Sequence, residues 1–221
     1  MGTTKLGLYN KALNMAGERA LDTVDENVEA RRLLDVVWDN GGVDECISEG
    51  QWNFAMRSVK IDYDPAVEPD FGFNRAFTKP SDHILTSAFC SDEFFRAPHL
   101  QYVDEQDFWY CELDEIYVRY ISNDSEFGGD RGGWPAMFTK FVAAHFASEI
   151  ILKLTGDADK LKLFVNPDDP KKSIRGRALL DAKSRNAMSN PSQSMAQGKW
   201  SSSRLRGGAR RDGGSLSNLI G

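Results

Sequence analysis

The clearest pattern in the chain lies between residues 29 and 39, where apolar residues recur every three or four positions. They are Ala30, Leu33, Leu34, Val37 and Trp38. Residues at this spacing lie along one face of a helix, and charged residues occupy the positions between them. Gly41 and Gly42 interrupt the pattern. Because each glycine inside a helix costs about 1 kcal/mol relative to alanine, we expect a kink or a break there.

A period of two replaces the helical period after Trp52. Apolar and polar residues alternate within residues 56–63 and again within residues 116–121. Alternation of this kind is typical of strands that bury one face. We therefore expect residues 51–133 to form a strand-rich part of the chain, and we interpret the glycines of residues 128–133 as a flexible connection out of it.

Helical spacing returns at Trp134. Residues 134–156 are apolar almost all round the helical circumference, and Pro135 suits the first turn because its missing amide would have no partner there. A helix of this kind is buried centrally or against neighbouring subunits. Residues 166–170 interrupt the helical spacing. The sequence of residues 173–188 predicts a last helix that is basic on one side.

These patterns predict an α+β fold in four consecutive parts. Residues 1–50 form the first part of a helical bundle, residues 51–133 an inserted antiparallel β domain, and residues 134–188 the second part of the bundle. Residues 189–221 form an extended C-terminal arm that is rich in serine and glycine. Because the arm has few apolar residues to offset the entropy of ordering it, we expect it to fold only against a partner.

Charge and cysteine content narrow the class of protein. The chain carries a net charge of −6, and because the arm contributes +4, residues 1–188 carry −10. No stretch of the chain has the eighteen or more apolar residues of a membrane span, and no signal peptide precedes the first helix, so a soluble protein made in the cytoplasm is expected. The three cysteines lack a CxxC spacing, which favours inert core thiols over a disulfide framework or a zinc site.

Several motifs, taken in order, resemble the tail tubular protein A family of tailed bacteriophages. Glu29, Ala30 and Arg31 are followed by the segment 52–55, with the sequence Trp-Asn-Phe-Ala. Further matches cover the first helix at residues 6–17, the Pro-Asp turn within residues 77–82, the strand at residues 116–121 and the apolar helix at residues 134–156. The chain departs from the family pattern at Gly41, Gly42 and Gln51.

The resemblance implies a structural role in a virion. Members of that family are adaptors that form a ring of twelve copies below the portal, join the head to the tail and line the channel through which DNA leaves. The implied partners are the portal protein, a downstream tail or nozzle protein and further copies of the chain, and no cofactor, metal or membrane is implied. An acidic wall would let genomic DNA pass without binding it, because like charges repel. An acidic surface also simply favours solubility.

The resemblance assigns portal binding to the arm. Arginine provides forked contacts to carboxylates, and apolar residues near the end of the arm can act as anchors. The candidate residues are Trp200, Arg204, Leu205, Arg206, Arg210, Arg211, Leu216, Leu219 and Ile220. The same cations could instead contact DNA phosphates, which requires only charge, or the arm could have no partner. The sequence does not separate these alternatives.

Aromatic residues of the strand-rich part are candidates for contact with the downstream tail component. Exposed aromatic side chains are efficient anchors of protein interfaces, and we select Phe94, Phe95 and Trp109 on this ground. Burial of these residues within the sheet is the alternative.

Two other classes of function compete with the adaptor. A virion-associated cell-wall hydrolase would need two carboxylates at a suitable separation, but the neighbours Asp104 and Glu105, like Asp114 and Glu115, point to opposite faces of a strand. The three histidines fit no HExxH motif and no serine lies in a GxSxG motif, so we expect no catalytic residue. A monomeric scaffold, or a DNA-binding factor that completes the head, is the other alternative.

Overall fold

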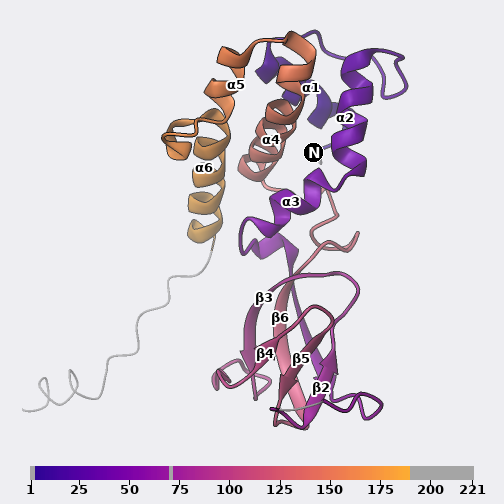
Figure 1. The fold of residues 1–221 in the computed structure, drawn as a ribbon, viewed down its shortest axis with the longest axis vertical. Coiled ribbons are helices and arrows are strands. Elements are labelled where there is room, and N and C mark those ends of the chain that lie inside the picture. The colour runs from indigo at the N-terminus through magenta and orange to yellow at the C-terminus, as the bar shows by residue number, and fades with distance from the viewer. Residues whose placement is uncertain (1–2, 70–71, 190–221) are drawn as a thin grey trace, which may run out of the picture. The chain divides into compact units, whose positions relative to one another are not determined.

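The computed structural model describes residues 3–69 and 72–189, and within them the chain has an α+β fold (Figure 1). The helices that precede the strands are α1 (Lys5–Ala16), α2 (Glu29–Asp39) and α3 (Gly42–Ser48). Those that follow the strands are α4 (Ala136–Thr155), α5 (Ala158–Phe164) and α6 (Ile174–Met188). Short 3-10 turns span Asn53–Ala55 and Pro170–Lys172.

The strands form two small antiparallel sheets. One sheet has the order β1-β6-β3, formed by Met56–Asp62, Glu115–Ser122 and His83–Cys90. The other has the order β2-β5-β4, formed by Arg75–Thr78, Phe108–Cys111 and Val103–Asp104. Along β6, Ile116, Val118 and Tyr120 are buried, as the alternation in this segment predicts. The division into four parts stays a prediction, although every strand lies within residues 51–133.

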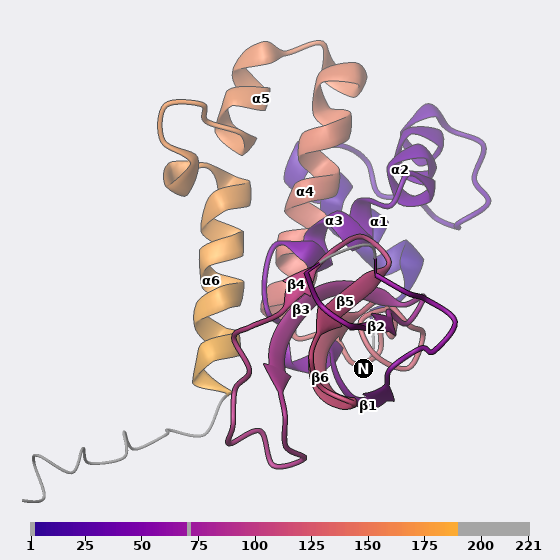
Figure 2. The ribbon, with the colours of Figure 1, turned by 60° about the horizontal axis from the view of Figure 1, so that its bottom comes forward.

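Helix α4 is the central element of the helical region. It contacts each of the other five described helices, and Figures 1 and 2 both show it between α2 and α6. Phe141, Val142 and Phe146 are completely buried, and even the polar residues Thr139 and Ser148 are nearly so. Central burial of this helix, one of the two alternatives that its composition allows, is therefore confirmed.

An aromatic cluster connects the start of α4 to the start of the sheet. The ring centroid of Phe138 lies 4.8 Å from that of Trp52, 4.7 Å from that of Phe54 and 5.2 Å from that of Trp134. The indole nitrogen of Trp52 donates a hydrogen bond to the carbonyl oxygen of Ile47 at 2.9 Å. Because this polar atom is paired, the whole side chain can be buried without an unsatisfied donor.

The expected break between the second and third helices is confirmed. Gly41 has φ +83°, a left-handed conformation that favours glycine, and it separates α2 from α3. At Gly42 a Cβ atom would lie 2.8 Å from the side chain and the carbonyl oxygen of Val37. The two glycines therefore allow α3 to turn back closely against the end of α2.

The glycine-rich segment before α4 is a packed turn, and our interpretation of it as a flexible connection is wrong. The amide of Gly128 donates to the carbonyl oxygen of Ser122, and the indole of Trp134 donates to the carbonyl oxygen of Gly128 at 2.7 Å. A Cβ atom on Gly128 would lie 2.3 Å from that same oxygen of Ser122. Glycine is needed here because two segments of backbone approach each other closely.

The described residues include no helix with the length and apolar content needed to cross a membrane. Cys46, Cys90 and Cys111 are free and buried, so their predicted place in the core is confirmed.

Truncation of Phe138 tests the importance of the aromatic cluster. We expect Phe138→Ala to lower the free energy of unfolding by about 3–5 kcal/mol, because it leaves a cavity among three aromatic rings. Its neighbour Met137 is 41% exposed, and Met137→Ala should cost less than about 1 kcal/mol. Urea denaturation of both variants measures the difference, and equal losses would contradict this description of the core.

Candidate protein-interaction site

The predicted portal-binding residues cannot be located in this structure. All nine, from Trp200 to Ile220, lie outside the described residues. Their assignment therefore stays a prediction.

The prediction that Trp109 is an exposed anchor is wrong. It lies on β5, where it pairs with Phe77 of β2, and both residues are completely buried. Its indole nitrogen donates to the hydroxyl of Thr86 on β3 at 3.0 Å. The side chain therefore fills the second hydrophobic cluster of the protein, with Phe89, Val118 and Tyr120. All four residues of β5 are apolar, so no alternation in the sequence marks Trp109 and Cys111 as the buried ones.

Phe94 and Phe95 lie in a loop that follows β3, residues 91–100, and they differ in exposure. Phe94 is 67% exposed, and the guanidinium of Arg96 lies 5.5 Å from its ring centroid. Phe95 is half-buried, with the guanidinium of Arg119 on β6 4.3 Å from its ring centroid. Leu100, at the end of the loop, is 85% exposed. Phe95 thus attaches the loop to the sheet, while Phe94 and Leu100 face solvent.

Hydrogen bonds connect the two sides of the loop and fasten its far end to β3. The carboxylate of Asp92 accepts from the amides of Arg96, at 3.1 Å, and Ala97, at 2.7 Å. These amide hydrogen bonds lower the pKa of Asp92. The amide of His99 donates to the carbonyl oxygen of Phe89, which fastens the far end of the loop to β3. Phe94 is therefore presented by an ordered loop.

Phe95 has an unusual backbone conformation. Its φ of +53° is the only positive value at a non-glycine residue in the described part of the chain. A left-handed residue with a Cβ atom costs roughly 1–2 kcal/mol, and such strain persists only where the surroundings impose it. At Phe95 the hydrogen bonds to Asp92 and the contact with Arg119 impose this conformation. Strained residues cluster at binding and switching sites, which supports a functional loop.

A second surface feature is an apolar groove beside the start of α4. Its volume is about 660 Å³, and its lining residues include Trp52, Phe54, Pro135, Met137, Phe138 and Arg185. Asn186 of α6 fixes one wall, because its side chain accepts from the amide of Asn53 at 2.9 Å and donates to the carbonyl oxygen of Gln51 at 2.8 Å. No local sequence signal marks the groove, since its residues come from segments about 80 and 50 positions apart.

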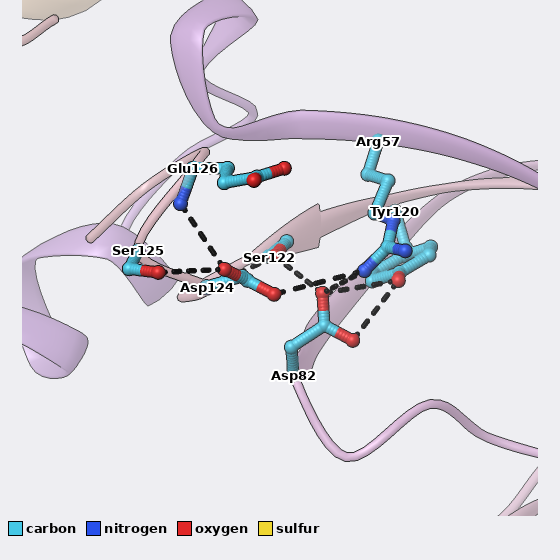
Figure 3. Close-up of polar contacts among 7 residues, drawn as sticks. All are labelled: Arg57, Asp82, Tyr120, Ser122, Asp124, Ser125 and Glu126. Atoms are coloured by element: carbon cyan, nitrogen blue, oxygen red, sulfur yellow. Dashed lines mark hydrogen bonds and ion pairs between the residues drawn. The ribbon is translucent and has the colours of Figure 1, made fainter. Parts of the chain in front are cut away.

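A polar junction ties the start of β3 to the end of β6 (Figure 3). The carboxylate of Asp82 accepts from Arg57 at 3.0 Å, from the hydroxyl of Tyr120 at 3.1 Å and from the hydroxyl of Ser122. Partial burial alone would raise the pKa of Asp82, but hydrogen bonds from Ser122, Arg57 and Tyr120 lower it. Burial and the neighbouring Asp82 raise the pKa of Tyr120 to about 12, so its hydroxyl remains a donor. Arg57 also lies 4.0 Å from a carboxylate oxygen of Asp124.

The polar groups around Thr86 hold the two sheets together. Thr86 donates to Asp104 of β4 at 2.6 Å and accepts from the indole of Trp109, while His83 lies 3.0 Å from the same hydroxyl. Because its proton is directed at Asp104, the hydroxyl is not arranged as a nucleophile activated by His83. Burial opposes ionisation of Asp104, yet hydrogen bonds from Lys79 and Thr86 lower its pKa, whereas a general acid needs a raised one.

Within residues 3–69 and 72–189, no three potential ligands gather to hold a metal ion.

His145 is a buried titratable group on α4. One ring nitrogen lies 3.2 Å from a carboxylate oxygen of Glu45, but neither nitrogen makes a hydrogen bond to any described residue. Burial lowers the pKa of His145, and Arg175 on α6 lowers it further, against the opposite influence of Glu149 on α4, Glu45 on α3 and Glu49 directly after α3. The side chain is therefore neutral where three helices meet.

No protein-family model matches the chain, and no curated protein matches it.

The buried His145 predicts an acid-sensitive fold. Because its pKa is lower in the folded state than the ordinary 6.5, the unfolded chain binds a proton first as the pH falls. The stability contributed by neutral His145 should be fully present above pH ~6.5 and decline below it, by up to about 1.4 kcal/mol per pH unit. Denaturation of the wild type and of His145→Gln between pH 8 and 5 measures this decline. Parallel stability curves would contradict it.

The Asp82 junction can be tested by a neutral replacement. We expect Asp82→Asn to lower the free energy of unfolding at pH 7 by about 1–3 kcal/mol, because three donors lose a charged acceptor. Since the pKa of Asp82 is lowered on folding, the loss should shrink as the wild type is titrated through that pKa in acid. Asp62→Asn is the control, because the side chain of Asp62 is 79% exposed, and it should change stability by less than about 0.5 kcal/mol.

Proposed function

We propose that this chain is a head-to-tail adaptor subunit of a tailed bacteriophage. In this proposal copies of the chain form a ring below the portal, join the head to the tail and line the channel through which DNA is ejected. The ordered resemblance to the tail tubular protein A family, from the Glu-Ala-Arg motif at residues 29–31 to the apolar helix, is the observation that carries the proposal. The protein would act at the head–tail junction of the virion.

The finer description of the fold belongs to the same proposal. The helices would form a helical bundle, with the strands inserted as an antiparallel β domain and residues 189–221 as a C-terminal arm. The contacts of α4 with helices from both ends of the described chain support the bundle, because α1 and α6 pack on the same helix. A body built in this way presents its sheets and helices as separate surfaces for different partners.

The loop of residues 91–100 supports a role in protein contact. It presents Phe94 and Leu100 to solvent on a backbone that its own hydrogen bonds hold. Exposed apolar side chains on an ordered loop are typical of interface anchors, because binding then requires little additional ordering. We propose that this loop contacts another protein of the head–tail assembly. The downstream tail or nozzle protein is the partner that the resemblance implies for Phe94 and Phe95.

The charge distribution of the sequence supports the remaining roles. Residues 1–188 carry a net charge of −10, which would repel DNA phosphates from the wall of a channel. The basic arm would bind the portal through its arginines and its apolar residues. The ring would contain twelve copies, the number that the resemblance implies.

Binding to portal rings tests the proposed function. We expect the full-length protein to co-sediment with purified portal rings, and a version that ends at Met188 to lose most of this binding because it lacks the arm. Circular dichroism and thermal denaturation of the shortened protein provide the control for folding. If neither version binds the portal, the adaptor proposal fails, and peptidoglycan hydrolysis and DNA binding by the full-length protein become the functions to measure.

A further inference from the structure

The loop of residues 91–100 carries a compact combination of an aromatic side chain and an acid. Phe94 is 67% exposed, and Glu93 beside it is exposed and takes part in none of the ion pairs formed by the described residues. The loop is already ordered by Asp92, so inserting Phe94 into a partner would cost little conformational entropy. We refer to Glu93 and Phe94 together as the knob.

The groove beside the start of α4 has the complementary chemistry. Aromatic and apolar side chains line most of it, and its volume of about 660 Å³ leaves room for an aromatic side chain with its neighbours. Within the described part of the chain, Arg185 is the only charged side chain in the lining, and it is exposed and forms no ion pair there. Asn186 holds the walls in place, so the groove exists before anything binds.

We propose that Phe94 of one copy of this chain inserts into this groove of a neighbouring copy, while Glu93 pairs with Arg185 at the rim. The proposal rests on the proposed function, because it names the partner of the loop within the adaptor. The half-buried ring of Phe54 can pack against a further aromatic ring, and the thioether of the exposed Met137 contacts aromatic rings favourably. An arginine and a carboxylate at the edge of such a contact form a charge-assisted hydrogen bond that fixes orientation.

Charge is the reason to select a second copy rather than another occupant. Among the described residues, the groove contributes one cation and no acid, and Glu93, which has no ion-pair partner there, lies beside the exposed Phe94 ring that Arg96 also approaches at 5.5 Å. Both parts of the proposed contact, the knob and the groove, are therefore present on the same chain. Because the knob and the groove are different surfaces, each copy can donate to one neighbour and receive from the other. A head-to-tail contact of this kind closes into a ring when its rotation allows.

Photo-crosslinking of the full-length protein tests the contact directly. Phe94→p-benzoylphenylalanine keeps an aromatic ring at the knob, and a mixture of isotopically labelled and unlabelled copies, with portal rings, identifies links between copies. We expect crosslinks from position 94 to peptides that contain Met137 or residues 182–189 of the other copy. Crosslinks to the downstream tail component or to the portal in place of these peptides would overturn the proposal and identify the true occupant.

A charge exchange provides a second test that does not depend on crosslinking. We expect Phe94→Ala to weaken association between copies about 30-fold, measured by sedimentation, as for a typical interface hot spot. Glu93→Arg and Arg185→Glu should each weaken it, and the double variant should restore much of the loss. Leu163→Ala is the matched control, because Leu163 is 62% exposed on α5, and it should have no effect. A double variant no better than the single ones would contradict the pairing.

The two proposals can fail separately. If Phe94→Ala still adds a complete ring to portals with unchanged affinity, the knob-and-groove contact is wrong while the adaptor function stands. If copies crosslink through position 94 but the protein never binds the portal, the contact stands and the adaptor function fails.

Discussion

The need to cover α4 on every side is the constraint on which the rest of the structure depends. Every residue from 141 to 148 is buried, so the middle of α4 cannot face water on any side without a large loss of hydrophobic free energy. The chain satisfies this need with all five other described helices and with the Trp52 segment that leads into the sheet. Segments from both ends of the described chain must therefore meet on one helix. This requirement explains why the strands lie between helices in the sequence but not between them in the core.

The groove, one of the two candidate interaction surfaces, lies where the covering of α4 ends. Helix α6 stops at Met188, and the segment from Trp52 to Phe54 packs on the start of α4, so the described residues leave a groove between them. The loop after β3 has a different origin, because it is held by its own Asp92 and by Arg119 of the sheet rather than by the helical core. Both surfaces are preformed, and both are apolar with a small number of charges. These properties suit a protein whose task is to connect other proteins.

Local patterns predicted the elements that bury a single face or that are apolar throughout. The spacing of Leu33, Leu34 and Val37 indicated α2, the alternation after Glu115 indicated β6, and the two glycines indicated the break before α3. Features that depend on tertiary contact were not predictable in this way. Trp109 is buried because the other sheet covers it, and the glycine turn is packed because Trp134 and Ser122 contact Gly128. The groove draws residues from three distant segments, and the arm that we propose binds the portal lies outside the described residues.

Electron cryomicroscopy of portal rings incubated with the full-length protein tests the central claim most directly. The adaptor account predicts a coaxial ring of additional density below the portal, into which copies of the described helices and strands fit, with twelvefold symmetry. Portal rings that carry no additional density, although the added protein is folded and in excess, would contradict the account.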